Sequence, residues 1–194
     1  MQKRIMTIIA ALAVCFCLAA CGAVDKAANE GAGEVDNAGA ASSTETASYG
    51  EAAKGGQMRD FIAETINGDA FTLSDMNGKV IMLNFWATWC GPCVGEMPAF
   101  PRLAEKYGDD LVLIAVNVGD DKETTKAFLD KNGYTDLTVI VDEDYAISKL
   151  YPTDAIPYTV IIDRNGTISA IELGASGDVD EMFEKYSGLI DAAM

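Results

Sequence analysis

The chain has 194 residues, a length that allows one ordinary domain and accessory segments. Its 30 acidic residues outnumber its 14 basic ones, and the net charge of −16 argues against nucleic acid or anionic lipid as a direct partner. The chain contains no histidine, so both the commonest general base and the commonest metal ligand are absent.

The first 20 residues are typical of an export signal. Lys3 and Arg4 precede an uncharged apolar run, residues 5–17 (IMTIIAALAVCFC), which as a helix would extend about 20 Å and is too short for a ~30 Å hydrocarbon core. The sequence LAAC that ends at Cys21 resembles the lipobox of bacterial lipoprotein signals. This resemblance implies a signal peptide at residues 1–20 and lipid chains on Cys21, which would anchor the protein to the outer face of the cell membrane. The alternative is an ordinary cleaved signal that leaves Cys21 as a free thiol.

Residues 21–56 form a compositional zone of Ala, Gly, Ser, Thr and acidic residues. A segment with so few large apolar side chains cannot offset the entropy that it loses on ordering. We therefore predict that it is a disordered tether and that residues 57–194 form one globular domain.

The start of this domain has the pattern of strands and a broken helix. The runs FIAETI and AFTL flank an Asn67-Gly68 turn, which predicts a β-hairpin. The runs VIMLNFW (80–86) and LVLIAVNV (111–118) are nearly all apolar, as in strands covered on both faces. We expect a helix over residues 92–107 that breaks near Met97, because Pro98 lacks the N–H that would bond the carbonyl of Val94.

The remaining elements alternate in the same way. We expect helices over residues 121–131, 144–150 and 178–192, the last capped by Asp178, and strands over residues 137–141, 158–163 and 167–173. Alternating strands and helices followed by a hairpin and a helix predict an α/β fold with a central mixed sheet flanked by helices.

The cysteines Cys90 and Cys93 lie in the stretch ATWCGPCVGEMP. Covalent haem attachment requires C-x-x-C-H, but residue 94 is Val. A structural zinc site requires about four N or S ligands, and two cysteines without any histidine leave only carboxylates to complete it, so this alternative is weak. A zinc ion shared between two copies would escape this argument, but no feature of the sequence calls for one. A static disulfide across so short a loop would gain little loop-closure entropy. A dynamic dithiol/disulfide is the best account, with no metal.

The position of the pair predicts a division of roles. Cys90 falls between a buried strand and a helix start, where backbone amides and the helix dipole stabilise a thiolate. We expect Cys90 to be the nucleophile and Cys93, one helical turn further on, to be the resolving thiol. Trp89 is interpreted either as a packing residue or as a flat contact surface beside Cys90.

The stretches NFWATWCGPCVGEMP (84–98) and AIPYTVIIDRNG (155–166) resemble the TlpA/ResA-type membrane-anchored thiol-disulfide oxidoreductases of the thioredoxin superfamily. The resemblance covers about residues 57–193 and implies a thioredoxin-like fold with an N-terminal hairpin and an inserted strand and helix between Val118 and Ile156. It implies that Ile156-Pro157 is a cis-proline pair that binds substrate beside the cysteines; the alternative is a trans proline that starts a strand.

The resemblance also bears on proton transfer. Thioredoxins usually carry a buried aspartate where this chain has Asn84, whereas the TlpA/ResA pattern places an acid at Glu96. Glu96 is therefore the candidate proton shuttle for Cys93. The alternative is a solvated helix glutamate.

The resemblance finally implies a reductant that receives electrons from an integral membrane partner and reduces disulfides of exported proteins, often that of apocytochrome c before haem attachment. No cofactor is expected. A thiol oxidase or isomerase at the same site stays an alternative, as does a non-catalytic binding lipoprotein. A peroxidase is disfavoured, because Leu83 and Ala87 stand where the peroxiredoxin pattern requires Pro and Ser or Thr.

Overall fold

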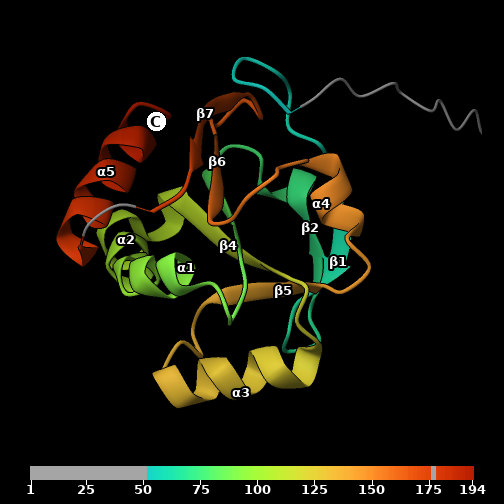
Figure 1. Cartoon of the computed structure of the whole chain (residues 1–194). Coiled ribbons are helices and arrows are strands. Elements are labelled where there is room, and N and C mark those ends of the chain that lie inside the picture. The colour runs from blue at the N-terminus through green and yellow to red at the C-terminus, as the bar shows by residue number, and fades with distance from the viewer. Residues whose placement is uncertain (1–51, 176–177) are drawn as a thin grey trace, which may run out of the picture. The chain divides into compact units, whose positions relative to one another are not determined.

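The computed structural model of the chain describes residues 52–175 and 178–194 (Figure 1). The expected signal peptide, Cys21 and most of the expected tether lie outside these residues. In the described part of the chain, no helix is long and apolar enough to cross a membrane.

The predicted mixed sheet is confirmed and has five strands in the order β5-β4-β3-β6-β7. The middle strand, β3, is parallel to β4 and antiparallel to β6. Every residue of β3 is buried, as its nearly continuous apolar run predicts for a central strand. The strands are β3 (Val80–Trp86), β4 (Leu111–Val118), β5 (Thr138–Asp142), β6 (Tyr158–Ile162) and β7 (Ile168–Leu173).

The predicted N-terminal hairpin is also confirmed. Strands β1 (Ile62–Glu64) and β2 (Ala70–Thr72) pair antiparallel, and Gly68 in their turn has a φ of 94°, which favours glycine. The hairpin joins the main sheet through the backbone N–H of Ile66, which donates to the carbonyl of Val139 at 2.8 Å.

The domain begins before residue 57. Gly55 N–H donates to the carbonyl of Ile168, and Ile168 N–H donates to the carbonyl of Gly56, both at 2.8 Å. The last residues of the segment expected to be a tether therefore pair with β7.

Helices and the hairpin cover opposite faces of the sheet. Because side chains alternate along a strand, Val80, Met82 and Trp86 of β3 pack in one core cluster with the helices α1, α2, α3 and α5. Ile81, Leu83 and Phe85 pack in the other cluster with the hairpin and α4. The helices are α1 (Gly91–Glu96), α2 (Ala99–Tyr107), α3 (Lys122–Asn132), α4 (Ala146–Leu150) and α5 (Val179–Asp191), with short 3₁₀ turns η1 (Leu73–Met76) and η2 (Gly108–Asp110).

The alternation also places Asn84, between Met82 and Trp86, on the side of α1 and α5. The helix break falls where Pro98 predicts it, because α1 ends at Glu96 and α2 begins at Ala99. Asp178 caps α5 as expected, since its carboxylate accepts the N–H of Glu181 at 2.9 Å.

Candidate active site

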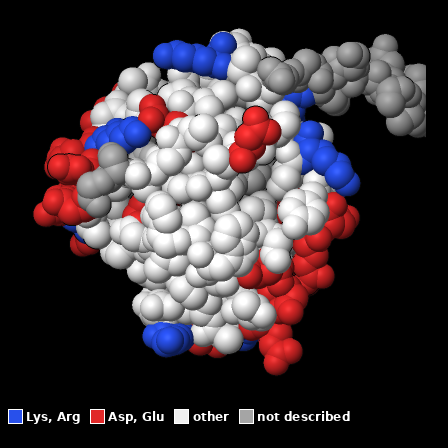
Figure 2. All heavy atoms as spheres, viewed as in Figure 1, with Lys and Arg blue, Asp and Glu red and all other residues white. Residues whose placement is uncertain are grey.

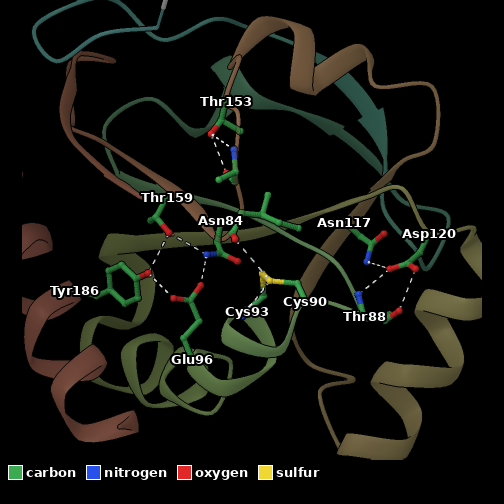
Figure 3. The surroundings of a disulfide bond; sticks show 12 residues. Asn84, Thr88, Cys90, Cys93, Glu96, Asn117, Asp120, Thr153, Thr159 and Tyr186 are labelled. Carbon is green, nitrogen blue, oxygen red and sulfur yellow. Dashed lines mark hydrogen bonds between the residues drawn. A yellow bond between two sulfur atoms is a disulfide. The ribbon is translucent and has the colours of Figure 1, made fainter. Parts of the chain in front are cut away.

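The cysteine pair lies just beyond the end of the middle strand. Cys90 is the N-cap of α1, Cys93 lies one turn further on, and their sulfurs form a disulfide (Figure 3). Cys90 is 6% exposed and Cys93 is fully buried. The N–H of Cys93 donates to the sulfur of Cys90 at 3.3 Å, an interaction that would also stabilise a thiolate there. An incoming group can therefore reach Cys90 and not Cys93.

The loop before Cys90 is held by Asp120, which follows β4. Its carboxylate accepts the backbone N–H of Thr88 at 2.8 Å, the hydroxyl of Thr88 at 3.0 Å and the amide of Asn117 at 3.0 Å (Figure 3). Asp120 was not predicted as a site residue, although an acidic residue two positions after a buried strand was a signal. These three hydrogen bonds fix the path of the chain into Cys90.

The cis-proline loop lies against the pair. The Ile156–Pro157 bond is cis, and the carbonyl oxygen of Ile156 lies 3.8 Å from the sulfur of Cys90. The hydroxyl of Thr153 donates a hydrogen bond to the carbonyl of Ala155 at 2.8 Å and accepts one from the backbone N–H of Ala155 at 3.3 Å. These two bonds make the segment before Ile156 a compact turn. The structure thus brings Ile156 and Pro157 to the cysteines.

Trp89 presents its ring to solvent, being 68% exposed, which favours its interpretation as a contact surface. It borders a hollow of about 480 Å³ beside the cis-proline loop, lined also by Phe85, Val118, Tyr145 and Ile156. Figure 2 shows the molecule from the same side as Figure 1, where α1 and β6 are in view. Few charged side chains lie in the middle of this face, and most of the acidic residues lie toward its edges.

Glu96 is buried, at 1% exposure, so the interpretation as a solvated helix glutamate is wrong. Asn84 Nδ2 donates to Glu96 Oε1 at 2.7 Å and to Thr159 Oγ1 at 2.9 Å. The Tyr186 hydroxyl donates to Glu96 Oε2 at 2.8 Å and lies 3.1 Å from Thr159 Oγ1. These four side chains close a hydrogen-bonded ring beside the disulfide (Figure 3).

Burial sets the protonation of this ring. It raises the pKa of Glu96 from 4.5 to about 7, although the hydrogen bonds from Tyr186 and Asn84 and the charge of Lys185 act to lower it. Burial also raises the pKa of Tyr186, with the charge of Glu96 as the second cause, so this phenol stays protonated. Glu96 can thus change its charge near neutral pH within the ring.

No group of three or more metal-ligating side chains occurs within residues 52–175 and 178–194. What the site can do is exchange a dithiol and a disulfide, with an accessible sulfur, a buried sulfur behind it and a titratable carboxyl three residues further along the helix.

Comparisons with known proteins agree with this chemistry. Residues 55–171 match the model of the AhpC/TSA family. The chain is 38% identical to the thioredoxin-like protein YneN of Bacillus subtilis over 62% of its own length and 72% of that protein. It is 32% identical to the thiol-disulfide oxidoreductase ResA of the same species, over 71% of this chain and 75% of ResA.

A solved structure supports the same fold. The chain resembles a candidate thiol:disulfide interchange protein DsbE from Chlorobium tepidum with a TM-score of 0.66 and 30% identity, over 73% of this chain and 97% of that protein.

Proposed function

The chain belongs to the AhpC/TSA family, and from that premise we propose that it reduces disulfides of exported proteins. It is a thiol-disulfide oxidoreductase with a C-x-x-C redox site formed by Cys90 and Cys93. The reducing direction of the reaction and the class of substrate are what we propose beyond this activity.

In the proposed reaction, the Cys90 thiolate attacks one sulfur of a substrate disulfide, and the other substrate sulfur leaves as a thiolate. Cys93 then loses its proton and attacks Cys90, which closes the internal disulfide and releases the second substrate thiolate. The substrate gains two electrons and the cysteine pair loses two. The observation that carries this order of events is the difference in burial, 6% exposure for Cys90 against none for Cys93.

The substrate would lie along the cis-proline loop. The backbone of Ile156, next to Pro157, is the proposed partner of an extended substrate segment, and its closeness to the Cys90 sulfur, 3.8 Å, supports this. The exposed ring of Trp89, which lines the same hollow as Ile156, would also contact the substrate. Main-chain pairing accepts many sequences, so this arrangement suits a reductant with several clients.

Glu96 is the proposed acceptor of the Cys93 proton. It lies three residues after Cys93 on α1, and its pKa of about 7 is close to the optimum for a group that both takes and gives a proton near neutral pH.

The Gly91-Pro92 dipeptide between the cysteines resembles that of reducing thioredoxins and motivates the direction. We propose that an integral membrane partner resupplies the electrons and that the lipid on Cys21 holds the protein at the outer face of the bacterial cell membrane. Apocytochrome c before haem attachment is one proposed client among these exported proteins.

Insulin reduction and a midpoint potential test the proposal. We expect catalysed precipitation of insulin chains by the wild-type protein in dithiothreitol, none by Cys90→Ser, and a midpoint potential near that of thioredoxin, about −270 mV. A midpoint potential of about −120 mV would instead identify a thiol oxidase at the same site.

A further inference from the structure

The ring around Glu96 is completed by a side chain from the far end of the domain. Tyr186 lies on α5, 90 residues beyond Glu96, and its hydroxyl reaches Glu96 Oε2 at 2.8 Å. Tyr186 and Thr159 are each 1% exposed, so neither hydroxyl is free to exchange its partners for water.

The hydrogens of the ring can be assigned when Glu96 is a carboxylate. The two hydrogens of Asn84 Nδ2 point to Glu96 Oε1 and to Thr159 Oγ1. Thr159 accepts that bond, so its own hydrogen can point to the Tyr186 oxygen, and the Tyr186 hydrogen points to Glu96 Oε2. Every hydrogen then has an acceptor, and both carboxylate oxygens have a donor.

The assignment changes when Glu96 holds a proton on Oε2. The carboxyl group then donates to the Tyr186 oxygen, the Tyr186 hydrogen turns to Thr159 Oγ1, and the Thr159 hydrogen turns away from Tyr186 and out of the ring. The 3.1 Å separation of the two hydroxyls permits either of them to be the donor. Asn84 does not take this part in the orientation observed, because it faces Glu96 with Nδ2, which only donates, and its Oδ1 has no hydrogen-bond partner among the described residues.

We propose that Tyr186 and Thr159 are positioning residues for Glu96, a pair of hydroxyls whose orientations reverse together when the carboxyl group gains or loses its proton. The proposal rests on the proposed function in one respect, that Cys93 is the source of this proton. One proton passes from sulfur to the carboxyl group, and no electron accompanies it. The hydroxyl pair keeps both forms of a buried acid hydrogen-bonded.

Other groups near Glu96 do not respond in this way. Lys185 of α5 lowers the pKa of Glu96 by its charge, and Lys185 is itself paired with Glu172 of β7. Cys93 lies on the same helix, and Asn84 of β3 carries no charge. Tyr186 and Thr159 are therefore the two groups whose reorientation follows the proton.

The test is a carbon-13 NMR titration of the Glu96 carboxyl group in the oxidised protein, with the signal assigned by its loss in Glu96→Gln. Tyr186→Phe removes the donor to the carboxylate, so the titration midpoint should move upward from about 7 by about one pH unit or more. Thr159→Val is nearly isosteric and removes the acceptor that the Tyr186 hydrogen needs in the acid form. The midpoint should therefore move downward in that variant.

Tyr107→Phe is the matched control. The Tyr107 hydroxyl lies 3.0 Å from the carbonyl of Ser187 and 2.8 Å from the carboxylate of Asp191, so its loss loosens α5 without touching Glu96. This variant should leave the midpoint unchanged. An unmoved midpoint in Tyr186→Phe, an equal shift in Tyr107→Phe, or an upward shift in Thr159→Val would each overturn the proposal. Failure of the proposed function would appear separately, as absent insulin reduction by the wild-type protein.

Discussion

Replacing Glu96 by glutamine should remove a pH dependence from the stability of the oxidised domain. Burial raises the pKa of Glu96 from 4.5 to about 7 in the folded protein, whereas the unfolded chain exposes this group to water. The folded state therefore holds a proton that the unfolded state has lost between these two values. The stabilising contribution of Glu96 is fully present below about pH 4.5 and is lost as the pH rises through about 7.

The size of the effect follows from the interval between the two pKa values. From 4.5 to about 7, at 1.36 kcal/mol for each pH unit, the free energy of unfolding should fall by about 3 kcal/mol because of this one group. The pKa of about 7 already includes the hydrogen bonds from Tyr186 and Asn84, which favour the carboxylate and make this loss of stability smaller than burial alone would.

Urea unfolding of the oxidised protein at pH 4.5 and pH 8 measures this effect. Wild type should lose about 3 kcal/mol more stability between the two pH values than Glu96→Gln. Glu105→Gln, which changes an exposed glutamate of α2, is the control and should behave as wild type. An equal loss in wild type and Glu96→Gln would refute the argument that a buried, titrating Glu96 lies at the site.

Two further substitutions separate the roles of the loop and the contact surface. Asp120→Ala leaves the backbone N–H and the hydroxyl of Thr88 without their acceptor, so it should destabilise the domain by about 1–3 kcal/mol and slow insulin reduction. Unchanged stability and an unchanged rate would argue that Asp120 does not anchor the loop. Trp89→Ala removes a ring that is 68% exposed, so the free energy of unfolding should change by less than about 0.5 kcal/mol while the KM for a protein disulfide rises. A stability loss of several kcal/mol would instead favour the interpretation of Trp89 as a packing residue.

The sheet and the helix break were predictable because local signals determine them. The apolar runs of β3 and β4 fix two buried strands, and the missing N–H of Pro98 separates α1 from α2. In the same way, Asn67-Gly68 specifies the hairpin turn. These features depend on residues close together in the sequence.

The site was only partly predictable, because it also depends on residues that are far apart in the sequence. Cys90 and Cys93 lie in one motif, and Glu96 lies one turn beyond, but the burial of Glu96 depends on partners that are distant in the sequence. Tyr186 lies 90 residues from Glu96, and Thr159 lies 75 residues from Asn84. Helical spacing alone therefore left open whether Glu96 faced solvent. The antiparallel pairing of Asn84 with Thr159 across β3 and β6, together with α5, determines the outcome.

The most direct measurement is the capture of a mixed disulfide by each single-cysteine variant. Reduced Cys93→Ala, mixed with a disulfide-bonded protein substrate at pH 7, should accumulate a covalent adduct, which mass spectrometry of the digested product should locate at Cys90. Reduced Cys90→Ala should form little adduct, because the Cys93 sulfur is fully buried. Equal trapping by both variants, or an adduct at Cys93 alone, would contradict the account in which Cys90 attacks and Cys93 resolves.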